Sequence, residues 1–315
     1  MALHPQCKAF LDQLATMGGK PLHETPPAEA RKTPLPPALA GDEQPVARVE
    51  DRRIPGPAGA IAVRVYWPST GRRLPALIFA HGGGFVLGNI ESADRPCRAL
   101  ANLSGAVVIN VDYRLAPEHP FPAAVDDFDA VTQYVAEHAD EFGIDPHRLA
   151  VGGESAGGNL AAVTAIVARD RGTPAIAFQL LIYPQVDMTD VDRPSMREFA
   201  SGYFITREII DYFTGHYLSR ASDPLDPRAS PLLASDLTGL PPAFIMTAEC
   251  DPLRDQGEEY ARRLQQSGVK VMLKRYDGMF HPFFSLAAII DEAKVAHADA
   301  AAALRDALKG EPLPA

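Results

Sequence analysis

The 315-residue chain contains few cysteines, and the three present are not arranged to act together. Cys7, Cys97 and Cys250 stand far apart, are odd in number and belong to no CxxC or Cys/His cluster. Disulfide frameworks and structural zinc sites depend on paired or closely spaced cysteines. We therefore expect free thiols, no disulfide framework and no structural zinc site.

Long apolar runs and an excess of positive charge are also missing. No stretch approaches the ~18 apolar residues of a membrane-spanning helix, and the N-terminal segment lacks the basic start and apolar run of a signal peptide. The net charge is −10, whereas nucleic-acid binding requires a basic surface. These absences predict a cytoplasmic protein with no membrane or nucleic-acid partner.

The sequence does contain a repeated alternation of strand-like and helical segments. Hydrophobic residues make up 46% of the chain, enough to bury a large core. Several strand-like runs are apolar throughout, which is typical of a parallel sheet covered on both faces, and the alternation predicts a three-layer α/β sandwich. We expect strands at 60–68, 75–81, 106–113, 148–153, 177–184, 242–249 and 269–277, and helices at 122–141, 155–171, 254–267 and 286–308.

Two regions fall outside this alternation. Residues 1–45 combine one amphipathic helix with a proline-rich connector that cannot be continuously helical. The connection after Pro184 is also too long for a simple crossover. Because ligands bind beyond the carboxyl ends of strands in an open α/β sheet, an insertion at that edge can cover a site. We expect an N-terminal cap helix and connector at 1–45, and an α/β domain at 46–315 with a cap insertion around 185–220.

Residues 153–157, Gly-Glu-Ser-Ala-Gly, match the pattern G-x-S-x-G between a predicted strand and a predicted helix. In that setting the motif forms a sharp turn that presents the serine as a nucleophile, and its glycines let the neighbouring backbone approach closely. An ordinary glycine-rich turn is the alternative. A phosphate-binding loop is excluded because no Gly-Lys-Ser/Thr follows. The context predicts that Ser155 is a nucleophile.

A serine nucleophile requires a base, which in chains with this motif follows the serine in the sequence. Three histidines follow Ser155. His281 lies in a loop just after the last predicted strand, whereas His297 falls inside a helix and His216 inside the insertion. We therefore expect His281 to be the base.

The acid that orients the base should follow an earlier strand. The segment 247–255 offers three carboxylates, of which Asp251 lies directly beyond the predicted strand 242–249. Asp255 begins a helix, and Glu249 is at the strand end. We favour Asp251 and leave Asp255 and Glu249 as alternatives.

A second glycine-rich segment, His81 to Phe85, follows another predicted strand. Three consecutive glycines cost backbone entropy, but they leave N–H groups free of side chains beside a substrate oxygen. We expect Gly83, Gly84 and Ala156 to form an oxyanion hole, and a flexible surface loop is the alternative. His81 is expected to anchor this loop rather than to bind a metal.

Together these motifs resemble those of the hormone-sensitive-lipase-like carboxylesterases, a family of α/β-hydrolases. The resemblance implies an eight-stranded, mostly parallel sheet with a helical cap. It also implies hydrolysis of short- to medium-chain acyl esters, with no cofactor and no metal, by the triad Ser155, Asp251 and His281. The motifs that carry it lie at 81–85, 111–124, 152–160, 181–184, 251–255 and 278–281.

The sequence departs from the family pattern at three positions. Phe85 stands where Trp is frequent, Glu154 where Asp or Thr is frequent, and Pro282 where Gly is common. Glu154 cannot be the triad acid, because adjacent residues on such a turn point apart. We expect Glu154 to hold the serine turn or the glycine loop through hydrogen bonds, with simple packing or solvent exposure as the alternative. Phe85 is expected to shape the acyl pocket.

Two other functions are compatible with these residues. An amidase or arylformamidase would use the same machinery on a different bond. A non-catalytic receptor would use the same pocket, although receptors of this group lack the histidine base that His281 provides here. A small-molecule ester is the expected partner, and a homodimer is a candidate oligomeric state.

Overall fold

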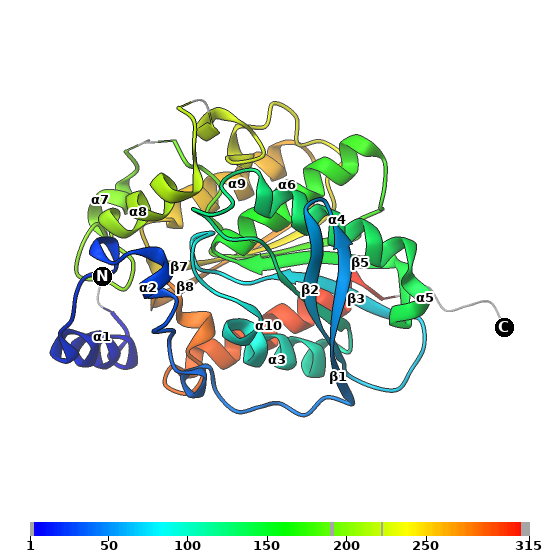
Figure 1. Cartoon of the computed structure of the whole chain (residues 1–315), viewed down its shortest axis with the longest axis horizontal. Coiled ribbons are helices and arrows are strands. Elements are labelled where there is room, and N and C mark those ends of the chain that lie inside the picture. The colour runs from blue at the N-terminus through cyan, green and yellow to red at the C-terminus, as the bar shows by residue number, and fades with distance from the viewer. Residues whose placement is uncertain (1–2, 190–191, 222, 310–315) are drawn as a thin grey trace.

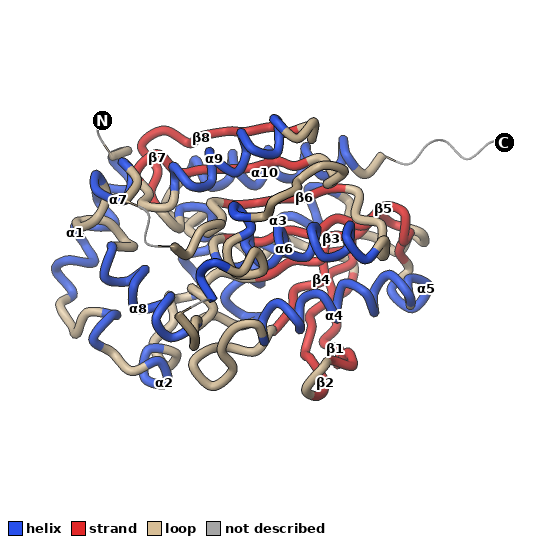
Figure 2. The backbone as a smooth tube through the Cα atoms, turned by 90° about the horizontal axis from the view of Figure 1, so that it is seen from above, coloured by secondary structure: helices blue, strands red, loops and turns tan. Residues whose placement is uncertain are grey.

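The computed structural model describes residues 3–189, 192–221 and 223–309, and an eight-stranded sheet lies at its centre. The strand order is β1-β2-β4-β3-β5-β6-β7-β8. Strands β3 to β8 pair in parallel, whereas β2 pairs antiparallel with both β1 and β4. Helices cover both faces (Figures 1 and 2). The predicted mostly parallel α/β sheet with flanking helices is confirmed.

The elements follow one another along the chain as strands separated by helices. The strands are β1 (Arg48–Gly56), β2 (Gly59–Trp67), β3 (Leu74–Ala80), β4 (Val107–Asp112), β5 (Ile144–Glu154), β6 (Phe178–Ile182), β7 (Ala243–Cys250) and β8 (Val271–Phe280). The helices are α1 (Pro5–Met17), α2 (Pro27–Ala30), α3 (Asp94–Ser104), α4 (Ala123–Glu137), α5 (Ala139–Phe142), α6 (Ala156–Arg171), α7 (Pro194–Glu198), α8 (Arg207–Tyr217), α9 (Arg254–Gln266) and α10 (Asp291–Ala307).

The hydrophobic core forms two layers, one on each face of the sheet. Helices α4, α6 and α9 pack on one face, and α3 and α10 pack on the other. Strands β6 and β7 are buried at every residue. Apolar side chains on both faces are what a parallel strand needs when helices cover it from both sides. This burial fixes the carboxyl ends of the central strands.

The sequence analysis missed β1 and predicted one helix where the structure has two. Strand β1 alternates exposed charged residues with partly buried ones and forms a hairpin with β2, so it lacks the apolar run used to find the other strands. The helix expected over 122–141 is two helices, because the backbone leaves helical geometry at His138. Helix α3 was not among the named helical segments.

The N-terminal segment and the insertion lie together at one end of the sheet. Figures 1 and 2 both show α1 and α2 next to α7 and α8. The hydroxyl of Tyr212 on α8 donates to the carbonyl of Thr25 (2.8 Å). Phe10 on α1 stacks on Phe280 at the end of β8, with ring centroids 6.0 Å apart. Among the described residues, no helix has the length and apolar character needed to cross a membrane.

Candidate active site

Ser155 occupies a strained turn between β5 and α6. Its φ of 57° and ψ of −117° lie in a region that non-glycine residues rarely adopt. Glycines beside it are required by space, since a Cβ at Gly157 would lie 2.0 Å from the carbonyl oxygen of Ala80. The backbone N–H of Ser155 donates to the carbonyl of Ile182 (2.9 Å), which ties the turn to β6. The fold thus holds the serine in a fixed position.

His281 and Asp251 reach Ser155 from the carboxyl ends of two other strands. The His281 Nε2 atom lies 2.9 Å from Ser155 Oγ, and its Nδ1 atom lies 2.8 Å from Asp251 Oδ2. With the proton on Nδ1, the imidazole donates to the carboxylate and accepts from the serine hydroxyl. Three residues far apart in the sequence therefore form one hydrogen-bonded chain.

All three residues are buried, and the acid is fully enclosed. Asp251 is 0% exposed, and its second oxygen accepts from the backbone N–H of Leu253 (2.8 Å). A buried carboxylate is tolerated only when its oxygens have partners, and here each oxygen has one. Asp251 is thus an acceptor that holds the imidazole in a single tautomer, and His281 is free to take the Ser155 proton.

The alternative acids have other partners. Glu249 Oε2 accepts from the backbone N–H of Gly278 (2.6 Å), so it links β7 to β8. Asp255 accepts from the backbone N–H of Ser195 (2.8 Å), which joins α9 to the start of α7. Neither carboxylate bonds to His281.

The alternative bases lie elsewhere as well. His297 is buried in α10, and its Nε2–H donates to the carbonyl of Phe284 (2.9 Å). Burial lowers the pKa of His297 to about 4. His216 lies on α8, where its ring packs against Tyr212. Of the three candidate histidines, only His281 is hydrogen-bonded to Ser155.

The glycine loop after β3 has backbone geometry that only glycine adopts easily. Gly83 has a φ of 116°, and a Cβ there would lie 2.2 Å from the carbonyl oxygen of Leu87. Gly84 has a φ of 59°. Within the part of the chain that the structure describes, the N–H groups of Gly83, Gly84 and Ala156 donate to no protein acceptor. Three unused donors are suited to bind an anionic oxygen.

His81 lies directly before these glycines and is fully buried. Its Nδ1–H donates to the carbonyl of Gly82 (2.7 Å), and its ring stacks on Tyr113 with centroids 4.3 Å apart. Burial lowers the pKa of His81 to about 4, so the ring is neutral near pH 7. In the described residues, no group of three or more His, Cys, Asp or Glu side chains could hold a metal ion.

Glu154 is buried beside the serine and accepts two hydrogen bonds at Oε2. One comes from the hydroxyl of Tyr183 (2.7 Å) and the other from the hydroxyl of Ser285 (2.8 Å). Tyr183 also packs against His281, with ring centroids 4.4 Å apart. A bond from Glu154 to the glycine loop was also expected, but the two donors lie after β6 and after His281. Glu154 therefore connects the serine turn to the segment that carries the base.

Phe85 and Gly84 touch the helix that lies over the loop. The Phe85 ring stacks on Tyr217 at the end of α8, with centroids 3.8 Å apart. A Cβ at Gly84 would lie 2.2 Å from the ring of Phe213 on the same helix. Because α8 approaches so closely, any residue larger than glycine at position 84 would push it away.

Arg31 fastens the N-terminal segment to the same loop, a contact that the sequence reasoning missed. Its guanidinium donates to the carbonyls of Val86 (2.8 Å) and Ala116 (2.6 Å) and forms a bidentate pair with Glu118. In the sequence, Arg31 stands in a proline-rich connector and carries no motif. Only the folded contact identifies it.

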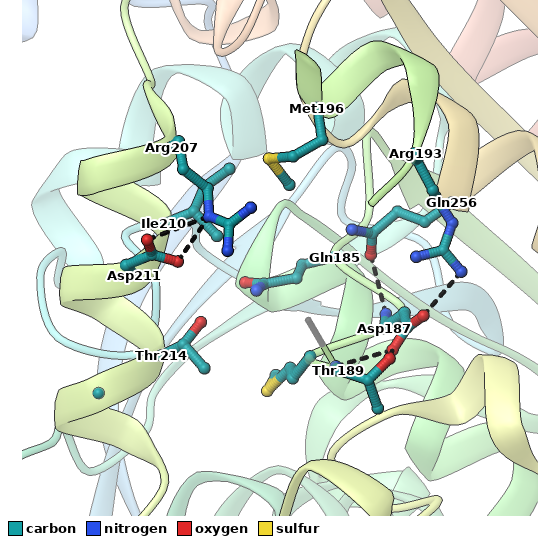
Figure 3. A pocket seen from close by; sticks show the side chains of 12 residues that line it. Gln185, Asp187, Thr189, Arg193, Met196, Arg207, Ile210, Asp211, Thr214 and Gln256 are labelled. Carbon is teal, nitrogen blue, oxygen red and sulfur yellow. Dashed lines mark hydrogen bonds and ion pairs between the residues drawn. The ribbon is translucent and has the colours of Figure 1, made fainter. Parts of the chain in front are cut away.

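A cavity of about 300 Å³ adjoins the serine turn, between the segment after β6 and α8. Figure 3 shows that polar side chains surround much of it. Gln185 connects the cavity to the turn, since its backbone N–H donates to the carbonyl of Ser155 (3.3 Å). The lining includes Gln185, Asp187, Arg193, Met196, Ile210 and Thr214.

The serine turn, the hydrogen-bonded histidine and aspartate, and the free N–H groups can be compared with those of known proteins. A model of the α/β hydrolase fold matches residues 77–285. The chain belongs to the α/β-hydrolase fold family. The matched residues include every residue of the hydrogen-bonded chain described above.

Curated relatives make the assignment more specific. The carboxylesterase NlhH of Mycobacterium tuberculosis is 44% identical over 287 residues, which cover 89% of this chain and 88% of that protein. The carboxylic ester hydrolase LipN of the same organism is 48% identical over 244 residues. That match covers 76% of this chain but only 65% of LipN. The resemblance to the hormone-sensitive-lipase-like carboxylesterases is confirmed.

Solved structures agree with the relatives. A hyperthermophilic esterase from the archaeon Pyrobaculum calidifontis superposes with a TM-score of 0.93 at 44% identity. The superposition covers 98% of this α/β-hydrolase and all of the archaeal chain. The α/β-hydrolase fold expected from the motifs is confirmed over nearly the whole length.

Proposed function

We propose that this α/β-hydrolase is a carboxylesterase that acts through a covalent acyl-enzyme. The observation that carries the proposal is the hydrogen-bonded chain from Asp251 through His281 to Ser155, with contacts of 2.8 and 2.9 Å. As Ser155 Oγ attacks the ester carbonyl carbon, His281 Nε2 takes the serine proton. Asp251 stabilises the imidazolium that results and does not itself take up the proton.

The oxygen of the attacked carbonyl becomes negatively charged and needs donors. In the proposal, the N–H groups of Gly83, Gly84 and Ala156 bind it, because they donate to no other acceptor among the described residues. The N-terminus of α6 adds a favourable dipole at the same place. Loss of one such donor costs about 10²–10³ in kcat in other enzymes.

The first half ends when His281 gives its proton to the leaving alcohol, as the ester C–O bond breaks and acyl-Ser155 forms. In the second half, the same imidazole takes a proton from a water molecule, whose oxygen attacks the acyl-Ser155 carbonyl. His281 then returns this proton to Ser155 Oγ as the bond between Oγ and the acyl carbon breaks. The carboxylic acid leaves, and the free serine is restored.

Short- to medium-chain acyl esters are the proposed substrates. The cavity beside Ser155 is about 300 Å³, and ion pairs such as Arg193 with Asp187 (2.7 Å) lie in its wall. A long hydrocarbon chain would remove these charges from water without giving them a new partner. Chain length is therefore limited by the polarity of the wall as well as by its size.

We also propose that three residues support the site without touching the reacting atoms. Glu154 positions the segment that carries His281, His81 holds the glycine loop, and Phe85 joins that loop to α8. Residues 1–45 and the insertion around 185–220 act together as a cap. Support comes from the contacts of Tyr212 with Thr25 and of Phe85 with Tyr217.

Two further proposals concern the protein in its surroundings. A homodimer is supported by β8, which pairs with β7 alone and exposes Met272 and Leu273. Light scattering of the purified protein decides between monomer and dimer. A cytoplasmic location is supported by three buried free cysteines, which suit a reducing compartment.

The central proposal is tested with Ser155→Ala and p-nitrophenyl butyrate. The wild type should release a rapid burst of p-nitrophenol followed by steady turnover, and the variant should show no burst and a loss of kcat of at least about 10⁴-fold. Ser201→Ala, at an exposed position, is the matched control and should behave as the wild type. Appreciable turnover by Ser155→Ala, or faster cleavage of a matched amide than of the ester by the wild type, contradicts the proposal.

A further inference from the structure

Gln185 is a buried polar side chain with no partner. It is 6% exposed, and Figure 3 shows its amide extending into the cavity between β6 and α8. Within the described ranges, this amide forms no hydrogen bond with another protein atom. The amide opens onto the cavity, so an entering molecule with a hydrogen-bonding group can pair with it, whereas a purely apolar one would leave the amide without a partner.

A second unused group faces the same space from the opposite wall. Thr214 on α8 lines the cavity, and its hydroxyl has no hydrogen-bond partner among the described residues. Figure 3 shows Thr214 on the α8 side, across from the segment that carries Gln185. The cavity therefore presents unused donors and acceptors on two sides.

The charged groups around the cavity are already matched with one another. Arg193 pairs with Asp187 (2.7 Å) and with Glu259 (3.1 Å), and Arg207 pairs with Asp211 (2.9 Å). An anionic or cationic substrate would compete with an existing partner instead of filling a vacancy. The lining thus favours a neutral polar group over a charged one.

The backbone that carries Gln185 is held rigidly. The Nδ2–H of Asn159 donates to the carbonyl of Gln185 (2.7 Å). The side-chain oxygen of Gln256 accepts from the backbone N–H groups of Val186 (2.7 Å) and Asp187 (2.8 Å). A polar group on a fixed backbone selects ligands better than one on a loop that must be ordered on binding.

We propose that this cavity receives the part of an ester that carries a neutral hydrogen-bonding oxygen, such as an ether, hydroxyl or keto group. Gln185 is the specificity-determining residue, with Thr214 assisting from α8. Met196 and Ile210 pack against the carbon atoms of the same group. This inference rests on the proposed esterase function, because Gln185 joins the cavity to the serine turn and the proposed occupant is part of the ester that Ser155 cleaves.

The test compares pairs of esters that differ only by exchange of one CH₂ for an ether oxygen. On the acyl side the pairs are p-nitrophenyl butyrate with p-nitrophenyl methoxyacetate, and p-nitrophenyl pentanoate with p-nitrophenyl 3-methoxypropionate. On the alcohol side the pair is butyl butyrate with 2-methoxyethyl butyrate. For each pair, the ratio of kcat/KM for ether over hydrocarbon is measured in the wild type and in Gln185→Leu. The intrinsic reactivity of each ester cancels between the two enzymes.

We expect Gln185→Leu to lower this ratio about 2- to 10-fold on one side of the ester, the range of one net hydrogen bond. The side that responds identifies which part of the substrate enters the cavity. Gln265→Leu makes the same change at an exposed site on α9, outside the cap, and should leave all ratios unchanged. An unchanged ratio for every pair in Gln185→Leu overturns the inference.

Two measurements keep the outcomes distinguishable. If the wild type fails to hydrolyse any of these esters, the proposed esterase function is wrong, whatever the cavity does. If Gln185→Leu does not fold, Thr214→Val removes the facing hydroxyl with little change of shape. A ratio lowered in Thr214→Val then supports the inference, and an unchanged ratio in that variant overturns it.

Discussion

Two helices border the candidate active site, and they differ in how tightly they are packed. Helix α6 begins directly after Ser155 and buries 12 of its 16 residues, whereas α8 in the insertion buries only Ile210 and Tyr217 among its 11. Helix α6 lies in the centre of the fold against β5 and α4. Helix α8 lies over the site at the edge of the fold, beside the N-terminal segment (Figure 1).

This difference separates two tasks. The α6 side fixes the reacting groups, and its tolerance for change is low because each atom contacts core atoms on all sides. The α8 side supplies Ile210, Asp211 and Thr214 to the cavity wall, and most of its residues are exposed or only partly buried. In the proposals above, chemistry and selectivity are therefore assigned to parts of the chain with different local packing.

The largest predicted contrast comes from one substitution made in both helices. A Cβ at Gly157 in α6 would lie 2.0 Å from the Ala80 carbonyl oxygen, while a Cβ at Gly215 in α8 has no atom within 4 Å. Gly157→Ala should lower the free energy of unfolding by about 3 kcal/mol or more. Gly215→Ala should raise it by up to about 1 kcal/mol, because alanine favours the helix. Urea denaturation measures both, and a shift of the same sign in the two variants would show that the packing contrast is wrong.

A second prediction concerns the two buried histidines, His81 and His297, which lie in the tightly packed part of the fold as α6 does. The folded pKa of His297 is about 4, below the value of about 6.5 in an unfolded chain. Between these values the unfolded state binds more protons, so stability is fully present above pH 6.5 and falls as the pH drops toward 4. His81 behaves in the same way. Each histidine should contribute a slope of about 1.4 kcal/mol per pH unit within this window.

His297→Gln isolates one of the two contributions. Glutamine can still donate to the Phe284 carbonyl, but it does not titrate. The free energy of unfolding of this variant should therefore fall less steeply than that of the wild type between pH 6.5 and 4. Equal slopes for the two proteins would rule out a neutral, buried His297.

The third prediction concerns a substitution that weakens the connection between the serine turn and the segment of His281. Glu154→Gln replaces a charged acceptor of two hydrogen bonds by a neutral amide. We expect a loss of about 1–2 kcal/mol in the free energy of unfolding and a 3- to 10-fold lower kcat, with little change in KM. Ser285→Ala removes one of the two donors and should have a smaller effect of the same kind. Full kcat and full stability in Glu154→Gln would refute the positioning role.

The smallest predicted effect is that of a substitution in the N-terminal segment, which packs beside α8. Lysine at position 31 cannot reproduce the forked contacts of Arg31 with two carbonyls and Glu118. Arg31→Lys should lower kcat/KM about 2- to 5-fold and change the free energy of unfolding by about 1 kcal/mol or less. Arg262→Lys, at an exposed position, is the matched control. If Arg31→Lys lowered kcat as much as Glu154→Gln does, the N-terminal segment would matter to the chemistry as much as the tightly packed centre of the fold.

The sequence identified the parts of this molecule that combine strong local patterns. Ser155 lies in a motif flanked by a strand and a helix. The candidate Asp251 directly follows an apolar strand, and the candidate His281 directly follows the last strand of the sheet. Such positions are predictable because parallel strands bring their carboxyl ends to one edge of the sheet. Strand β1 was missed because it carries several exposed charged residues and has no continuous apolar run.

The contacts made by single polar side chains had no such pattern. Arg31 in a connector and Gln185 after a strand look like ordinary polar residues in the sequence. The partners of Glu154 were also out of reach, because Ser285 follows the base by four residues and lies 131 residues from Glu154 in the chain. Tertiary contacts of single polar side chains depend on the final arrangement of loops, which periodicity does not encode.

The place of His281 after an edge strand has a consequence for how the enzyme fails. Strand β8 pairs with β7 alone, so detachment of this one strand carries the imidazole away while the centre of the sheet stays intact. Inactivation on mild heating or in dilute denaturant should then precede the loss of the sheet's circular dichroism signal. Loss of activity would then measure detachment of the outermost strand of the sheet. It would occur before global unfolding of the molecule.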